Sequence, residues 1–362
     1  MTSEIQSLLT KEHHERSDII GLLRCGEEEA ALLYRKAAEI RDRYLGNIVY
    51  LRGLIEYSNV CGKNCLYCGI RHENRKVEHY TLTNDEVISA AMTAHRLNFG
   101  SIAIQAGENK SETFIDNIDL LIRTIRKMTD GQLGITLSLG EQKRETYERW
   151  FDAGAHRYLL RIEASSPDLY RKVHPDDNLH DYQTRLDCLK IIKETGYQTG
   201  SGVMVGLPHQ TLSHLADDII FMRDFDIDMC GMGPFIEHSD TPLGNNGTDN
   251  LFIRERFSLT LRMIAIARIV MKDINIVAST AMQSIDPTGR EKAIACGANV
   301  IMPNLTPERY REGYRIYNGK PSFSMIDDDN VSGLNLDIIP GAVIGLGIWG
   351  DTPHFSKRRS KS

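Results

Sequence analysis

The sequence has no run of 18 or more apolar residues, so it predicts no membrane-spanning helix. The opening stretch, residues 1–15, is polar and acidic and lacks the apolar segment of a secretion signal. The net charge of −6 lacks the basic excess that nucleic-acid binding favours. We therefore expect a soluble cytoplasmic protein that has neither a membrane nor a nucleic acid as its partner.

Cysteine is also scarce, and its distribution excludes a disulfide framework. There are seven cysteines in 362 residues, an odd number. Four are scattered and are interpreted as small buried apolar side chains: Cys25, Cys188, Cys230 and Cys296. The other three, Cys61, Cys65 and Cys68, lie within eight residues. No second cysteine pair or His-x3-His motif follows to complete a zinc site, so this cluster points to a different metal group.

What the sequence does contain is a repeated alternation of strand-like and helix-like segments. The strand-like runs are 47–58, 101–105, 134–139, 157–163, 200–206, 228–235, 275–280 and 299–303. The helical patterns are 84–97, 112–128, 143–153, 166–173, 182–195, 213–225, 251–272 and 286–295. This alternation predicts parallel strands with crossover helices. Eight such units favour an α/β fold of the (β/α)8 TIM-barrel type over an open doubly wound sheet, which usually has five or six strands.

Three regions follow from this pattern. Residues 1–47 are expected to form an N-terminal helical extension, and residues 48–320 the barrel. Residues 321–362 form a C-terminal segment with a basic tail, whose last residues, 356–362, are expected to have no fixed structure. In such barrels the chemistry lies at the carboxyl ends of the strands, which is where the cysteine loop falls.

The cysteine loop has the spacing C-x3-C-x2-C and includes an aromatic residue, Tyr67, before the third cysteine. Three thiolates can hold three corners of a 4Fe–4S cluster and leave the fourth iron open, as a catalytic metal requires. The motif resembles that of the radical S-adenosylmethionine (SAM) superfamily. In its biotin synthase-like branch, the chain resembles the HydE family of FeFe-hydrogenase maturases. That likeness is carried by residues 56–71, 136–141, 157–175, 202–211, 231–243 and 297–317.

The resemblance implies a cofactor set and a reaction. SAM would chelate the open iron, and its reductive cleavage would give a 5′-deoxyadenosyl radical. The substrate would be a small sulfur-containing iron complex with cysteine, carbon monoxide and cyanide, used in assembly of the hydrogenase H-cluster. The maturases HydG and HydF and an electron donor would be partners. Some relatives carry a second cluster on a C-terminal cysteine triplet. Residues 322–333 contain no cysteine, so one cluster is expected.

The resemblance also implies roles for single residues. It places around SAM Tyr67, Gln105, Gly107, Glu108, Ser138, Glu163, Arg185 and Met204. It assigns to a substrate or anion cavity Arg52, Arg157, Arg161, Ser279, Thr280, Met302, Tyr314 and Tyr317, with catalytic roles for Arg161, Thr280, Met302 and Tyr314.

For two groups of these residues the sequence also allows a structural role. Arg185 can clamp a carboxylate, but it can equally be a surface residue of helix 182–195. The strand arginines, Arg52, Arg157 and Arg161, either face inward as a cationic cavity or face outward toward helix carboxylates, because an unpaired buried charge is costly.

Two other functions fit parts of the pattern. One is a radical SAM mutase or sulfur-insertion enzyme of the methylornithine synthase or biotin synthase type. Biotin synthase carries further cysteines on its strands, where this chain has Gln105, Ser138 and Met204, and this lowers that possibility. The other is a non-enzymatic iron–sulfur carrier, which would have no need for Glu108, Glu163 and Arg185 around the cluster.

Overall fold

A ring of parallel strands forms the centre of the molecule. The computed structural model describes residues 2–244, 250–321, 326–327, 330–331 and 342–359. The ring runs in the order β1 (Ile48–Ser58), β2 (Ser101–Ala106), β3 (Gly134–Ser138), β4 (Arg157–Leu159), β5 (Gln198–Ser201), β7 (Met229–Cys230), β9 (Asn275–Ile276) and β10 (Val300–Ile301), and β10 pairs with β1. Between β9 and β10, the Asn299 amide donates to the Ile276 carbonyl at 2.9 Å. This closes the ring and confirms the predicted (β/α)8 barrel.

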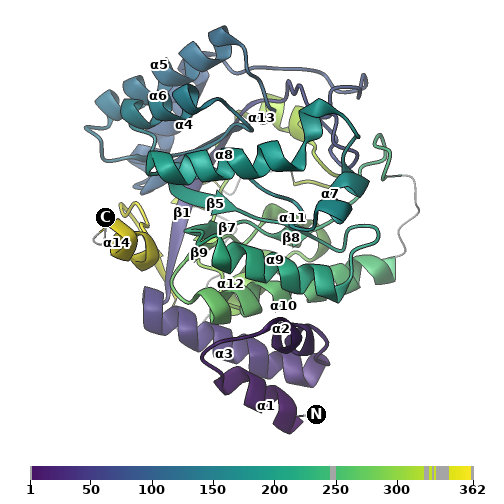
Figure 1. Ribbon diagram of the computed structural model, residues 1–362. Coiled ribbons are helices and arrows are strands. Elements are labelled where there is room, and N and C mark those ends of the chain that lie inside the picture. The colour runs from purple at the N-terminus through teal and green to yellow at the C-terminus, as the bar shows by residue number, and fades with distance from the viewer. Residues whose placement is uncertain (1, 245–249, 322–325, 328–329, 332–341, 360–362) are drawn as a thin grey trace.

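The crossover helices surround this ring (Figure 1). They are α4 (Asn84–Arg96), α5 (Glu112–Met128), α6 (Arg144–Ala153), α7 (Pro167–Val173), α8 (Tyr182–Thr195), α9 (Leu212–Asp224), α10 (Asn250–Met271) and α12 (Gly289–Ala295). Thr83 and Ser111 begin α4 and α5 by accepting backbone N–H groups on their hydroxyls. The helices match the predicted ranges closely, because each has a regular apolar face and a polar start.

Short elements finish the carboxyl end of the barrel. β6 (Met204–Val205) pairs with β8 (Gly233–Pro234) as a small extension beyond β5 and β7. The short helices are η1 (Asn178–His180), α11 (Thr280–Ile285), α13 (Glu308–Arg311) and η2 (Glu312–Tyr314). β11 (Ile326–Asp327) and β12 (Asn330–Val331) form a separate antiparallel pair. Helix α11 was not predicted: residues 275–280 were assigned to one strand, but the strand ends at Ile276 and Ser279 begins the helix.

Three helices precede the barrel and pack beneath it (Figure 1). They are α1 (Thr2–Thr10), α2 (Arg16–Leu23) and α3 (Glu27–Leu45). α3 packs along α10, and α2 packs on α9 and α10. Arg16 also donates from its Nε to Asp217 of α9 at 2.5 Å. No helix among the described residues is long and apolar enough to span a membrane.

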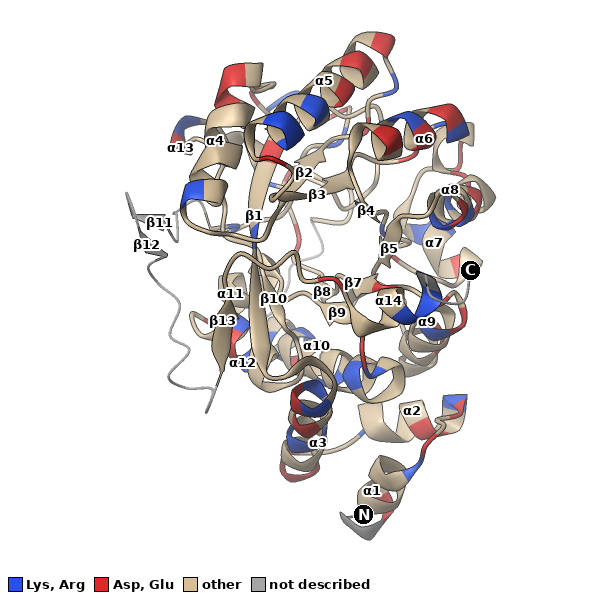
Figure 2. Cartoon of the chain, turned by 90° about the vertical axis from the view of Figure 1, so that its left-hand side faces the viewer, with Lys and Arg blue, Asp and Glu red and all other residues tan. Residues whose placement is uncertain are grey.

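The C-terminal segment returns to the amino end of the barrel. β13 (Val343–Gly345) pairs in parallel with the start of β1. Figure 2 shows α14 (Pro353–Arg359) beside α9 and β9. Arg358 donates to Asp228 at 2.7 Å, and Lys357 to Asp273 at 2.7 Å. The prediction that residues 356–362 have no fixed structure is therefore wrong for 356–359, because Lys357 and Arg358 form ion pairs with carboxylates of the barrel. Residues 360–362 lie outside the described part of the chain.

Candidate active site

The three predicted cluster cysteines lie on the loop that follows β1, at the carboxyl end of the barrel. Each is partly buried, and none is in a disulfide. Backbone N–H groups of Lys63 and Glu108 point at Cys61 Sγ, at 3.4 and 3.3 Å. Burial raises the pKa of Cys61 and raises the pKa of Cys65 to about 12. Burial therefore disfavours the thiolate form, which a bound cation would stabilise.

The loop after β2 lies directly against the cysteine loop. Gly107 donates its N–H to the Ser58 carbonyl at 2.9 Å. A Cβ at Gly107 would lie 2.4 Å from the Val60 carbonyl oxygen and 2.7 Å from Cys61 Cβ. Only glycine fits this close approach, which places the neighbouring Glu108 beside the cysteines.

A buried network of opposite charges connects this region to α8. The Glu141 carboxylate accepts hydrogen bonds from Arg185 Nε at 2.7 Å and from Lys63 Nζ at 2.8 Å. Glu108 lies 3.5 Å from Lys63 and 3.2 Å from Lys110, and it accepts the Glu141 N–H at 2.9 Å. Burial opposes ionisation of Glu141, but Arg185 and Lys63 outweigh it and lower the pKa of that carboxyl. The network holds two of the three charged residues predicted to bind SAM, Glu108 and Arg185, on the side of the barrel where the cysteine loop lies.

Arg185 faces inward and is buried, so the alternative of a surface arginine is wrong. Its Nη1 donates to the Arg161 carbonyl at 2.7 Å, which joins α8 to the end of β4. No acceptor for its Nη2 occurs among the described residues, and this nitrogen remains to donate to a carboxylate ligand.

Glu163 follows β4 and has a left-handed backbone, with φ of 64°. Its Oε2 lies 3.1 Å from Arg161 Nη2 but makes no hydrogen bond, and burial raises the pKa of the carboxyl. A strained backbone at the end of a strand is typical of a functional site. Close by, Tyr67 and Met204 pack against the same small apolar cluster, and Tyr67 Oη lies 3.1 Å from His174 Nε2.

A separate group of predicted residues lies inside the barrel. In the paired strands Glu56 is opposite Gln105, and Gln105 is opposite Ser138. Gln105 Nε2 donates to Tyr314 Oη at 3.2 Å. Ser279 Oγ is buried without a hydrogen-bond partner, and burial raises the pKa of Tyr317 to about 12. Thr280 and Met302 line an internal cavity, whose other walls are Leu54, Glu56, Arg290, Asn304, Lys320 and Pro321.

The three strand arginines do not line one cavity, because two of them lie near the amino end of the barrel and the third lies near its carboxyl end. Arg157 begins β4 and Arg161 comes after its end, about 13 Å further along the chain at strand spacing. Arg52 lies opposite Ser101, the first residue of β2, and is therefore also near the amino end. Both Arg52 and Arg157 are fully buried, so the outward-facing alternative is wrong for them. Arg157 Nη2 instead donates to Asp351 of the C-terminal segment at 2.6 Å.

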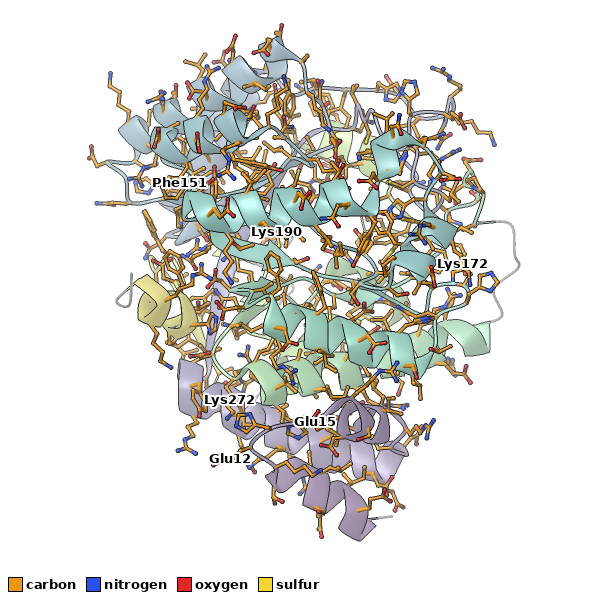
Figure 3. All side chains as sticks on the ribbon, viewed as in Figure 1. Glu12, Glu15, Phe151, Lys172, Lys190 and Lys272 are labelled. Atoms are coloured by element: carbon orange, nitrogen blue, oxygen red, sulfur yellow. The ribbon has the colours of Figure 1, made fainter. Side chains whose placement is uncertain are left out.

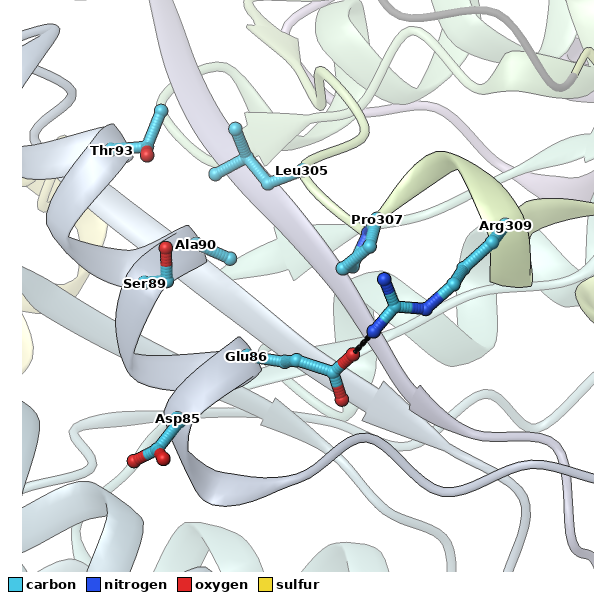
Figure 4. A pocket seen from close by; sticks show the side chains of 8 residues that line it. All are labelled: Asp85, Glu86, Ser89, Ala90, Thr93, Leu305, Pro307 and Arg309. Carbon is cyan, nitrogen blue, oxygen red and sulfur yellow. Dashed lines mark hydrogen bonds and ion pairs between the residues drawn. The ribbon is translucent and has the colours of Figure 1, made fainter.

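A larger pocket of about 340 Å³ lies on the surface between α4 and α13. Figure 4 shows Glu86 of α4 reaching Arg309 of α13 as an ion pair across it. None of the predicted site residues lines this pocket. The cysteine loop and the barrel interior thus remain the candidate active site.

The residues at the cysteine loop fit an iron–sulfur cluster and SAM. The donor set for the cluster is three thiols with two N–H groups directed at one sulfur. Two buried polar atoms, Glu163 Oε2 and Arg161 Nε, have no hydrogen-bond partner, and Arg185 donates to the Arg161 carbonyl beside them. Among the described residues, no three Cys, His, Asp or Glu side chains converge on a single ion.

Comparison with known proteins agrees with this geometry. Residues 55–222 match the model of the radical SAM superfamily. The chain is 48% identical over 288 residues to the [FeFe] hydrogenase maturase subunit HydE of Thermotoga maritima, covering 80% of this chain and 79% of that protein. The chain belongs to the HydE family. It is thus a radical SAM enzyme.

More distant relatives share the fold. A 3-methylornithine synthase of Methanosarcina acetivorans is 26% identical over 295 residues, covering 81% of this chain and 79% of its own. The crystal structure of the FeFe-hydrogenase maturase HydG of Carboxydothermus hydrogenoformans matches with a TM-score of 0.73 at 19% identity, over 87% of this chain and 74% of that one. The higher identity to HydE favours the maturase family over the mutase alternative.

Sequence reasoning missed four charged residues of the site: Lys63, Glu141, Glu56 and Lys320. Glu56, Lys63 and Glu141 lie within the ranges that carry the likeness to the HydE family, but no spacing rule pairs Lys63 with Glu141 across 78 residues. A glutamate within an apolar strand, as at position 56, was the one available signal, because buried carboxylates need partners.

Proposed function

We propose that the protein holds one 4Fe–4S cluster on Cys61, Cys65 and Cys68 and binds SAM beside it. When bound and reduced, the cluster and SAM together supply a 5′-deoxyadenosyl radical. The observation that carries this proposal is the placement of the cysteine loop against the Glu108–Glu141–Arg185 network at the carboxyl end of the barrel. Charged groups of both signs are available there for the carboxylate and ammonium of SAM.

The chain's own residues have separable tasks in this proposal. Arg185 binds the SAM carboxylate through its available Nη2, while Glu141 fixes the guanidinium. Glu108 and Glu163 accept hydrogen bonds from the ammonium and ribose. Tyr67, Gln105, Gly107, Ser138 and Met204 form the remaining walls. The barrel then excludes water, which protects a reactive radical from side reactions.

The substrate belongs in the interior, where Arg161, Thr280, Met302 and Tyr314 would contact it. We propose that it is a small sulfur-containing iron complex with cysteine, carbon monoxide and cyanide, delivered by HydG and passed on to HydF. A cytoplasmic electron donor would reduce the cluster. The similarity to HydE supports this role in hydrogenase maturation.

The proposal is tested by hydrogenase maturation in a defined mixture. Apo-hydrogenase is incubated with HydF, with HydG and the substrates from which HydG makes the iron complex, and with SAM and reductant. Hydrogen evolution is measured with and without this chain. The chain should restore activity, and a Cys65→Ala variant should not. If wild-type protein with an intact cluster adds no activity above the mixture lacking it, the maturase role is wrong.

A further inference from the structure

A buried ion pair occupies the internal cavity. Glu56 of β1 is 1% exposed, and its Oε1 accepts Lys320 Nζ at 2.5 Å. Asn304 Nδ2 donates to the other carboxylate oxygen at 3.1 Å. The Lys320 ammonium also lies 5.1 Å from the centroid of the Tyr314 ring. The Glu56 carboxylate, held in place by Asn304, and the aromatic face of Tyr314 together form a recognition site for one ammonium.

Lys320 also fills the space. With its side chain inside, the cavity lined by Thr280 and Met302 measures about 20 Å³, which is room for about one water molecule. A ligand of several atoms therefore enters this cavity only when the Lys320 side chain leaves it.

The segment that carries Lys320 lies at the surface. Asn318 and Gly319 are exposed, and a Cβ added at Gly319 would meet no atom within 4 Å. Lys320 is separated from Glu56 by 264 residues and lies six residues beyond η2. The Lys320 side chain can therefore leave the cavity, or be substituted, without disturbing a strand or helix of the barrel.

We propose that Glu56, which Asn304 holds by a hydrogen bond, and Tyr314 form a subsite for the primary ammonium group of an α-amino acid or an amino-acid moiety, and that Lys320 occupies it when no ligand is bound. Arg290 lines the same cavity and provides a guanidinium for the carboxylate of such a ligand. The ligand's ammonium displaces that of Lys320 and takes over the same partners. This inference rests on the proposed function for its biological meaning, because the substrate proposed above contains cysteine and the subsite would bind that amino-acid part.

The subsite is tested by calorimetric titration of the cluster-loaded protein with three matched probes. They are L-serine, ethanolamine, which lacks the carboxylate, and 3-hydroxypropionate, which lacks the ammonium. Lys320→Ala removes the internal competitor and opens space, so serine and ethanolamine should bind at least about tenfold more tightly than to wild type. Lys320→Met removes the charge but keeps the bulk, so it should improve binding less.

A double variant, Glu56→Gln with Lys320→Ala, tests the carboxylate and leaves no unpaired buried charge. It should lose the tenfold gain for both amines. Lys190→Ala, at an exposed lysine of α8 labelled in Figure 3, is the control and should bind like wild type. Thermal melting checks that each variant is folded.

Two results would overturn the subsite. In the first, 3-hydroxypropionate binds best and is lost with Lys320→Ala, so that Lys320 recognises an anion. In the second, folded Lys320→Ala binds none of the probes more tightly than wild type. Neither titration needs SAM cleavage or a hydrogenase, so failure here leaves the proposed function untouched, and failure of maturation leaves this binding result intact.

Discussion

Replacing Glu141 tests the charged network of the site, because this residue is assigned no direct contact with the cluster or with SAM and acts through Arg185 and Lys63. Its carboxylate is 2% exposed and accepts from two cations, Arg185 and Lys63. Glu141→Gln keeps the volume but turns one acceptor into an amide N–H that faces a cation. A hydrogen bond to a charged group contributes about 1.5–3 kcal/mol, and Glu108 at 3.5 Å compensates Lys63 only in part. We expect a loss of about 3 kcal/mol in unfolding free energy.

The same change should weaken SAM binding while the cluster remains. Arg185 loses the partner that aims its Nη2, so the SAM dissociation constant should rise by about tenfold or more. The assays are SAM titration and the iron–sulfur absorbance, with Glu145→Gln, an exposed carboxylate of α6, as the matched control. Wild-type SAM affinity in a stably folded Glu141→Gln protein would refute the idea that this network positions Arg185.

The pH dependence of stability has a defined sign. The folded-state pKa of Glu141 is lowered by Arg185 and Lys63 against the effect of burial. The ionised Glu141 carboxylate therefore stabilises the folded protein at pH values above the ordinary glutamate pKa of about 4.3. This contribution is lost as the pH falls through the lower pKa that Glu141 has in the folded protein. The difference in unfolding free energy between wild type and Glu141→Gln should shrink in that acidic range.

Three further predictions concern the cluster, its loop and the interior. Replacing Cys61, Cys65 or Cys68 by Ala should abolish the iron–sulfur absorbance. Single Ala variants at the other four cysteines should keep it, namely Cys25, Cys188, Cys230 and Cys296. Loss of the cluster in any of those four variants would contradict the ligand assignment. Gly107→Ala should lower cluster content after reconstitution, because its Cβ would overlap Val60 and Cys61, and full content would show that the loops can separate. Arg161→Leu should keep the cluster but stop hydrogenase maturation, measured in the defined mixture; normal maturation would remove Arg161 from the substrate site.

The sequence predicts the architecture well because the barrel is built from local patterns. The α8 range was predicted residue for residue, since Asp181 caps its start and Gly196 ends it. The strands were predicted too long after β3. Residues 157–163 contain only the three-residue β4, and beyond it the pairing continues only as an isolated bridge between Glu163, whose φ is 64°, and Val203.

The candidate site was predictable only where the signal is local. The cysteine spacing identifies the cluster loop, but Lys320 meets Glu56 from 264 residues away, and no local pattern marks that pair. Likewise, Asp351 reaches Arg157 from the C-terminal segment across 194 residues. Such pairs depend on where closure of the barrel brings distant segments together.

The most direct test of the central claim is SAM cleavage by the reduced, cluster-loaded protein. The purified chain is reconstituted with iron and sulfide without oxygen, reduced with dithionite and incubated with SAM, and 5′-deoxyadenosine is quantified by chromatography. We predict formation of 5′-deoxyadenosine by wild type and none by Cys65→Ala. A fully loaded, reduced wild-type protein that binds SAM but forms no more 5′-deoxyadenosine than the Cys65→Ala variant would contradict the account.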